Sequence, residues 1–90
     1  MSQDEAARIR SVIEAILEPT LKAHGLAGTG LPDELDLRRA GLVDSLGFVQ
    51  LIASLETRLG RVVDLAELDP EQLTTVGPLA RHIARRPATS

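Results

Sequence analysis

The side chain that most clearly suggests chemistry is the hydroxyl of Ser45, which follows Asp44 where a helix is predicted to begin. The first backbone N–H groups of a helix have no partner within the helix, and the helix dipole places partial positive charge there. Both effects stabilise a phosphate group at that position. The segment Gly41-Leu42-Val43-Asp44-Ser45-Leu46 therefore indicates a serine that carries a covalently attached phosphodiester.

A hydrolase triad is the alternative use of the same serine, with Asp44 and either His24 or His82 as its partners. The nucleophile elbow of such enzymes lies between a strand and a helix, and no such motif surrounds Ser45. Two isolated histidines in a chain without cysteine also make no zinc site. We therefore expect no catalytic site and no metal, and both histidines are predicted to be solvent-facing or at a helix border.

Two adjacent arginines, Arg38 and Arg39, come shortly before Gly41. A guanidinium group suits phosphate, so these side chains could contact the phosphate of an attached group or of its donor. The alternative, which the sequence alone favours, is that they are solvated loop charges without a function.

Composition indicates one small helical domain. The chain has 90 residues, of which 43% are apolar, so it can bury a modest core. It contains no cysteine, tryptophan or tyrosine and one phenylalanine, which excludes disulfide and thiolate-metal chemistry and favours a helical core of aliphatic residues. We expect a single domain over residues 1–86 and a disordered tail over residues 87–90.

Charge and hydropathy limit where the protein is expected in the cell and which partners it is expected to bind. No basic stretch followed by an apolar run opens the chain, and no apolar segment approaches the ~20 residues that a membrane span needs. We therefore expect a cytoplasmic protein without a membrane span. Between Asp33 and Glu71 there are nine acids and four arginines, and the net charge is −3, which argues against nucleic acid as a partner.

A first helix is predicted from Ser2, where Ser2 and Glu5 have the spacing of a capping box, to a stop before Pro19. After Leu21 follows a long connection that contains Gly25, Gly28, Gly30 and Pro32, too many helix breakers for another full helix. Within this loop the chain is expected to fold back on the core through three leucines. They are Leu35, Leu37 and Leu42.

A second main helix is predicted from Ser45 to Leu59, with Asp44 as N-cap and Gly60 as its stop. Its helical period gives a core stripe of Phe48, Leu51, Ile52, Leu55 and Leu59. A second, smaller apolar patch beside the serine consists of Leu46, Val49 and Ala53. This patch could be a docking surface, or the first helix or the long loop could simply cover it.

The last third of the chain is predicted to be extended over residues 61–63 and to form a helix of one or two turns after Asp69 and Pro70. A final helix begins at Thr74 or Thr75. The fold class is therefore all-α: a small four-helix bundle of three main helices and one short helix, with a long loop between the first two main helices.

Several landmarks together resemble the acyl and peptidyl carrier protein family over roughly residues 4–85. They are Asp44-Ser45-Leu46, the run Leu51-Ile52-Ala53-Ser54-Leu55-Glu56, Leu59-Gly60, and Thr75-Val76 opening a last helix that ends in Ile83. The resemblance implies that Ser45 carries phosphopantetheine taken from coenzyme A, and that the protein is a carrier rather than an enzyme.

The same resemblance implies partners. A phosphopantetheinyl transferase would attach the arm, an adenylating ligase would load it, and a transferase or condensing enzyme would unload it. The residues expected to contact these enzymes are Asp44, Leu46, Val49 and Ala53. We expect the carrier itself to be a monomer.

The motif is most similar to that of D-alanyl and stand-alone aminoacyl carriers, which tend to have Gly-Leu before Asp-Ser and Gly and Val-Gln after it. Carriers of the bacterial fatty acid type usually have acids where this chain has Gly47 and Gln50, and Glu56 is the only acid between Ser45 and Leu59. We therefore expect a small acyl or aminoacyl cargo. The alternatives are a fatty acyl or polyketide carrier, and a helical interaction module that keeps the fold but is never modified.

Overall fold

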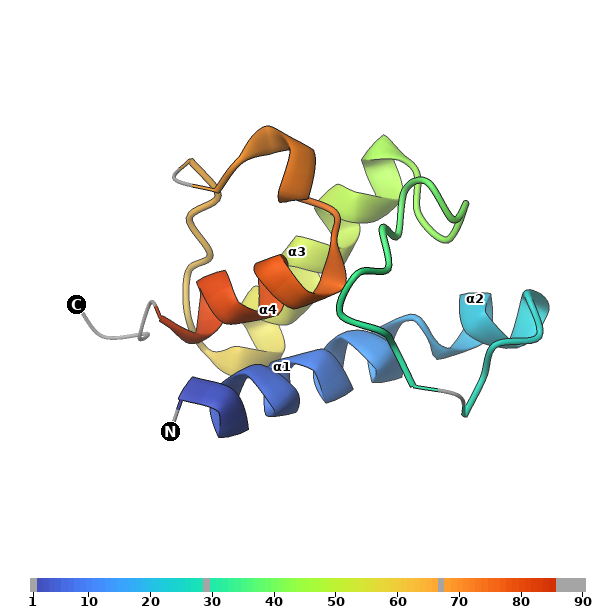
Figure 1. The fold of residues 1–90 in the computed structure, drawn as a ribbon, viewed down its shortest axis with the longest axis horizontal. Coiled ribbons are helices and arrows are strands. Elements are labelled where there is room, and N and C mark those ends of the chain that lie inside the picture. Colours follow the sequence, from blue (N-terminus) through green and yellow to red (C-terminus); the bar gives the residue numbers. More distant parts are fainter. Residues whose placement is uncertain (1, 29, 67, 86–90) are drawn as a thin grey trace.

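The computed structural model describes residues 2–28, 30–66 and 68–85. Within them the chain is helical and has no strand, so the predicted all-α fold class is confirmed. The elements are α1 (Ser2–Ile16), α2 (Glu18–Ala23), α3 (Ser45–Leu59), the 3₁₀ helix η1 (Pro70–Gln72) and α4 (Val76–Ala84). Helix α1 contacts α2, α3 and α4, and Figure 1 shows it running beneath α3 and α4.

The core consists of aliphatic side chains from every α-helix and from the long loop. Burying one such side chain stabilises a fold by about 1.5–3 kcal/mol. The largest fully buried ones are Ile9, Ile13, Leu21, Leu37, Leu51, Leu55, Val76, Leu79 and Ile83. The loop residue Leu37 is buried as completely as the helical residues, so the loop belongs to the core.

The first helix ends at Ile16, and a second, short helix that the sequence analysis missed follows it directly. Pro19 was predicted to end helix formation, but it lies in the first turn of α2. Proline is tolerated there because its missing N–H would have no helical partner in any case. Helix α2 buries Leu21 in the core, and the long loop starts only at His24.

Helix α3 has the predicted bounds and the predicted caps. The Asp44 carboxylate accepts a hydrogen bond from the N–H of Gly47 at 2.6 Å, and Gly60 ends the helix in the left-handed conformation, at φ 67°. The predicted stripe faces the core. Leu51 and Leu55 are buried, whereas Phe48, Ile52 and Leu59 are half-buried and pack against the core.

The helix predicted after Asp69 and Pro70 is a single 3₁₀ turn, in which the Asp69 carboxylate accepts from the N–H of Glu71 at 3.0 Å. Helix α4 begins as predicted, with Thr75 as its N-cap. The segment over residues 61–63 contains no helix or strand. The predicted tail over residues 87–90 lies outside the described residues.

The two histidines have different environments. His24 is exposed, as predicted, and its Nδ1–H donates to the Thr20 carbonyl at 2.9 Å. His82 was expected at the border of a helix face, but it is only 5% exposed, and its Nε2–H donates to the carbonyl of Asp64. The sequence interpretation of His82 was wrong because this acceptor comes from a distant part of the chain.

The long loop is fixed to the start of α4 by backbone hydrogen bonds. The N–H of Leu37 donates to the Thr74 carbonyl at 2.8 Å, and the N–H of Val76 donates to the Leu35 carbonyl at 2.9 Å. Leu37 and Leu42 are buried and Leu35 packs against the core, as predicted. The part of the loop over residues 35–37 is therefore held against the start of α4.

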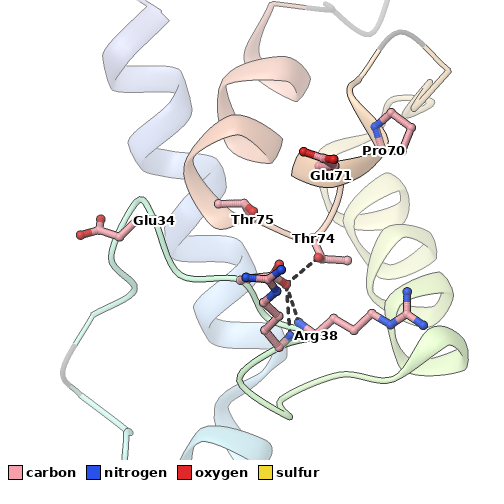
Figure 2. A pocket seen from close by; sticks show the side chains of 8 residues that line it. Glu34, Arg38, Pro70, Glu71, Thr74 and Thr75 are labelled. Carbon is pink, nitrogen blue, oxygen red and sulfur yellow. Dashed lines mark hydrogen bonds between the residues drawn. The ribbon is translucent and has the colours of Figure 1, made fainter.

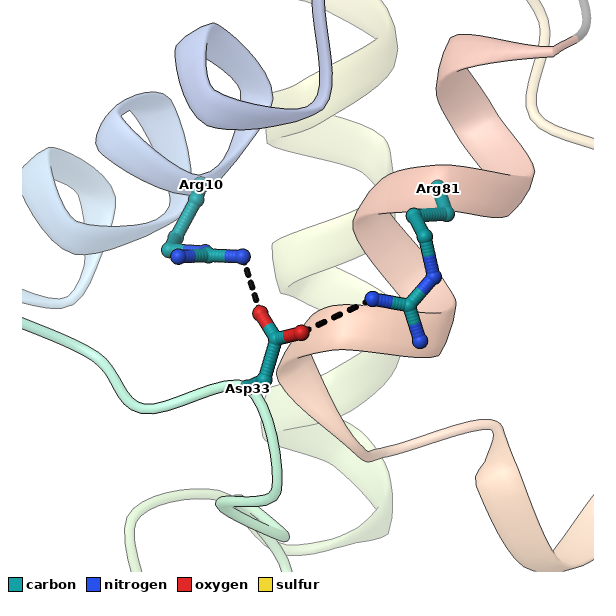
Figure 3. A network of polar contacts seen from close by, with 3 residues as sticks. All are labelled: Arg10, Asp33 and Arg81. Carbon is teal, nitrogen blue, oxygen red and sulfur yellow. Dashed lines mark hydrogen bonds and ion pairs between the residues drawn. The ribbon is translucent and has the colours of Figure 1, made fainter. Parts of the chain in front are cut away.

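Asp33 links this loop to two helices at once (Figure 3). One carboxylate oxygen accepts from Arg10 of α1, and the other accepts from Arg81 of α4 at 2.8 Å. Part-exposed ion pairs of this kind each stabilise a protein by about 0.2–1 kcal/mol. The main effect of this network is therefore to orient the loop between α1 and α4.

A second ion pair joins the chain after α3 to α1. Arg61, whose side chain is only 12% exposed, donates to the Glu5 carboxylate at 2.7 Å and to the Ile83 carbonyl at 3.2 Å. The Glu5 carboxylate, which the sequence placed in a capping box, thus has a tertiary partner. The chain that leaves α3 is consequently held against both α1 and α4.

Replacing Gly77 with alanine is expected to destabilise the protein. An added Cβ would lie 2.7 Å from Cγ and 2.9 Å from the carbonyl oxygen of Asp33, closer than such atoms can approach. A Gly→Ala change inside a helix ordinarily stabilises it by about 0.5–1 kcal/mol. Here we expect Gly77→Ala to lower the free energy of unfolding by about 1–3 kcal/mol in urea titrations followed by circular dichroism. A variant as stable as the wild type would contradict this contact.

Candidate functional site

Ser45 is the first residue of α3, and its side chain is exposed. The preceding Asp44 fixes the helix start twice: its carboxylate accepts from the N–H of Gly47, and its carbonyl accepts from the N–H of Phe48 at 2.8 Å. The hydroxyl therefore lies in solvent on a backbone that is held in place. It also lies at the positive end of the dipole of a 15-residue helix.

The turn before the serine is anchored in the core. Gly41 has a φ of 78°, a left-handed conformation that glycine adopts without steric cost. The N–H groups of Leu42 and Val43 then donate to the Leu37 carbonyl at 2.9 and 3.2 Å, and the side chains of Leu42 and Val43 are buried. Ser45 is thus presented two residues after a buried segment.

A shallow depression surrounds the serine. None of its lining residues is a histidine, so it holds no general base of the kind that a serine hydrolase requires. Arg38 supplies the only cationic side chain and Asp44 the only carboxylate of this lining. The lining consists of Arg38, Gly41, Leu42, Val43, Asp44, Ser45 and Gly47.

A second, polar depression lies on the other side of Arg38, where the loop passes the start of α4; Figure 2 shows Arg38, Thr74 and Thr75 among the side chains around it. At its centre the Asp36 carboxylate accepts from the Thr74 hydroxyl at 2.6 Å and from the N–H groups of Arg38 and Arg39 at 3.0 and 3.2 Å. Asp36 therefore fixes the backbone from which both arginines extend.

These contacts hold the pKa of Asp36 below its ordinary value of 3.8. The hydrogen bond from Thr74 is the largest cause, and the backbone hydrogen bonds and the charge of Arg39 act in the same direction. Partial burial acts in the opposite direction and raises the pKa of Asp36, but the other causes together lower it by more. The Asp36 carboxylate is thus stabilised in its charged form.

The apolar patch beside the serine is open to solvent. Leu46 is 67% exposed and Val49 is 62% exposed, and Ala53 is exposed as well. Neither α1 nor the long loop covers these side chains, so the alternative in which the patch is buried is wrong. Large apolar side chains next to each other on a surface often mark a site of protein contact.

Within residues 2–28, 30–66 and 68–85, no group of three or more histidine, cysteine or acidic side chains could hold a metal ion. In the same ranges no helix is long and apolar enough to cross a bilayer.

A comparison with protein families gives a meaning to the exposed serine at the start of α3. The family model described as phosphopantetheine attachment site matches residues 7–83. The chain belongs to this family of carrier proteins. Members carry a covalently attached phosphopantetheine, are typically non-catalytic, and interact with a phosphopantetheinyl transferase and with catalytic partners. Comparisons with the curated proteins and with the solved structures gave no significant match.

The residues around Ser45 fit such a group. Ser45 is exposed, the depression around it is open, and Arg38 from the long loop lines that depression. A phosphodiester on this serine would also lie at a helix N-terminus, which favours negative charge.

The contact between Thr74 and Asp36 predicts a pH dependence. Because the pKa of Asp36 is lowered on folding, its contribution to stability is present above pH 3.8 and is lost as the pH falls through its lower folded pKa. In Thr74→Val the pKa of Asp36 should return towards 3.8, which a carboxyl ¹³C NMR titration would measure. Thr57→Val is the matched control, since Thr57 donates to the Ala53 carbonyl within α3. An unchanged Asp36 titration in Thr74→Val would contradict the assignment.

Proposed function

We propose that this protein holds a small acyl or aminoacyl group as a thioester on a phosphopantetheine arm attached to Ser45. The observation that carries the proposal is an exposed serine at the capped start of α3, inside a chain that the phosphopantetheine attachment family matches over residues 7–83. The protein supplies a fixed attachment point and a surface, while partner enzymes supply the catalytic groups.

Attachment would proceed as a phosphoryl-type transfer from coenzyme A. The Ser45 oxygen forms the new bond to phosphorus and loses its proton, while the phosphoanhydride bond to the 3′,5′-bisphosphoadenosine leaving group breaks. The phosphodiester that results is negatively charged. The helix dipole and the backbone N–H groups at the start of α3 favour that charge.

The partners we propose are a phosphopantetheinyl transferase, an adenylating ligase and a downstream transferase or condensing enzyme. Support for a protein contact comes from the exposed patch of Leu46, Val49 and Ala53, which continues along α3 from the serine. Asp44 is proposed as a further contact at the same end of the helix. We propose that the carrier works as a monomer in the cytoplasm.

The surface of α3 favours a small cargo. A carrier that docks through acids would need them on this helix, but Gly47 and Gln50 occupy the expected positions, and Glu56 is its only acid. The Glu56 carboxylate already accepts from the N–H of Val63 at 2.8 Å, so it is tied to the chain that follows α3. A charged aminoacyl amine is costly to bury and is best kept at the surface.

Two alternatives remain distinct from this proposal. A fatty acyl or polyketide carrier would have to shelter a long chain beside the half-buried Phe48, which packs against the core. An unmodified interaction module would keep the helices but never accept the arm.

The first test is modification of Ser45. Incubating the protein with coenzyme A and a broad-specificity phosphopantetheinyl transferase should add one phosphopantetheine mass, measured on the intact protein. Ser45→Ala should add none, and Ser54→Ala, a change later in the same helix, should behave as the wild type. Modification that persists in Ser45→Ala would rule out this attachment point.

A second test separates docking from folding. Val49→Asp places a charge on an exposed side chain, so loading by the cognate ligase should fall while the thermal midpoint changes little. Leu55→Asp buries an unpaired carboxylate and should unfold the domain. Equal losses of stability in the two variants would show that Val49 belongs to the core.

The third test concerns cargo. NMR spectra of the holo protein should change little when the arm carries an aminoacyl group, because the charged amine stays in solvent. The octanoyl form should behave similarly if the core is closed. Large shifts around Phe48, Leu55 and Ile83 with octanoyl alone would show a chain-binding cavity and favour a fatty acyl or polyketide carrier.

A further inference from the structure

We propose that Arg38 positions the arm by pairing its guanidinium with the phosphodiester on Ser45, and that the adjacent Arg39 does not take part. The inference rests on the proposed attachment at Ser45 and adds a specific residue to it. It also replaces the simpler sequence interpretation, in which both arginines are solvated loop charges.

Arg38 and Ser45 line the same depression. Arg38 and Arg39 both line the polar depression beside Thr74 and Glu71, but Arg39 is not among the residues that line the depression around Ser45. Of the two adjacent arginines, Arg38 is therefore the one that shares a depression with the attachment point.

Backbone hydrogen bonds hold Arg38 in place. Its N–H donates to the Asp36 carboxylate at 3.0 Å, and its carbonyl accepts from the N–H of Gly41 at 3.1 Å. Ser45 follows the same turn and is fixed by the Asp44 cap. Both ends of the proposed pair therefore start from ordered backbone, which limits the entropy lost when a long side chain is held in one geometry.

The charges around Ser45 also favour a role for Arg38. Attachment places a phosphodiester next to the carboxylate of Asp44, and two neighbouring anions repel each other. Arg38 is the one cationic side chain among the residues lining that depression. A guanidinium can bind phosphate through two parallel hydrogen bonds, so it can offset this repulsion and orient the group as well.

The guanidinium group of Arg38 is available for a new partner. Among the described residues, the side-chain ion pairs involve Arg10, Arg61 and Arg81, and neither the Arg38 nor the Arg39 guanidinium forms one. The charge of Arg39, however, lowers the pKa of Asp36, so Arg39 already has an anionic neighbour. Arg38 remains the guanidinium that a new anion in the depression can engage.

The experiment compares the apo and holo forms of the wild type, Arg38→Gln and the matched control Arg39→Gln. Intact mass first establishes that each holo sample carries the arm. The ³¹P shift of the phosphodiester and the ¹H–¹⁵N signals of the arginine Nε–H groups are then recorded. We expect the Arg38 Nε–H signal to shift on attachment and the Arg39 signal to stay, and the ³¹P signal to move in Arg38→Gln but not in Arg39→Gln.

Ionic strength and the variant Arg38→Lys provide two further tests of this ion pair. Raising the ionic strength from about 0.01 M to about 1 M shortens the Debye length from about 30 Å to about 3 Å, so the Arg38 shift on attachment should shrink by more than half. Arg38→Lys should keep part of the wild-type ³¹P shift, because it retains the charge but loses the forked donor.

The experiment distinguishes a failure of the proposed attachment from a failure of the proposed role of Arg38. If the mass of the wild type does not increase, the proposed attachment fails and the role of Arg38 fails with it. If the mass increases but the Arg38 signal is the same in apo and holo protein, or Arg39→Gln moves the ³¹P signal as far as Arg38→Gln does, only the assignment to Arg38 is overturned.

Discussion

The contact between Asp33 and Gly77 is the constraint on which the position of the site depends. The Gly77 N–H donates to the Asp33 carbonyl at 2.8 Å, and the space beside Gly77 is too small for a Cβ. The carboxylate of the same aspartate bridges Arg10 of α1 and Arg81 of α4. One loop residue thus fixes the long connection to two helices, and the segment after it can follow the start of α4 and bury Leu37 before it turns at Gly41.

This anchoring explains how an exposed serine can have a defined position. The proposed attachment requires Ser45 to be accessible to a transferase, so this residue cannot be held by burial. Leu42 and Val43 just before it are buried instead, and the Asp44 cap fixes the helix end. Helix α3 then has two different sides. Leu51 and Leu55 hold it to the core, while Leu46 and Val49 stay in solvent. The same helix can therefore stabilise the fold and present a surface.

Local signals in the sequence predicted the elements whose ends depend on local chemistry. Asp44 and Gly60 gave the bounds of α3, because an N-cap carboxylate and a left-handed glycine act within a few residues. Helix α2 was missed because Pro19 can end one helix or begin the next. The burial of His82 depends on a contact with the Asp64 carbonyl in a distant segment, for which the sequence carries no local signal. The depression that Arg38 shares with Ser45 is lined by residues 38–47 alone, but its shape depends on how the turn at Gly41 folds, which residue types do not specify.

The central claim is that the anchored loop and the capped helix present one particular hydroxyl for covalent attachment. Tandem mass spectrometry of trypsin-digested holo protein tests it most directly, since cleavage after Arg39 and Arg58 releases residues 40–58 with both Ser45 and Ser54 in one peptide. The account predicts that fragment ions place the whole phosphopantetheine mass on Ser45. Attachment at Ser54, or on any peptide from another part of the chain, would contradict it.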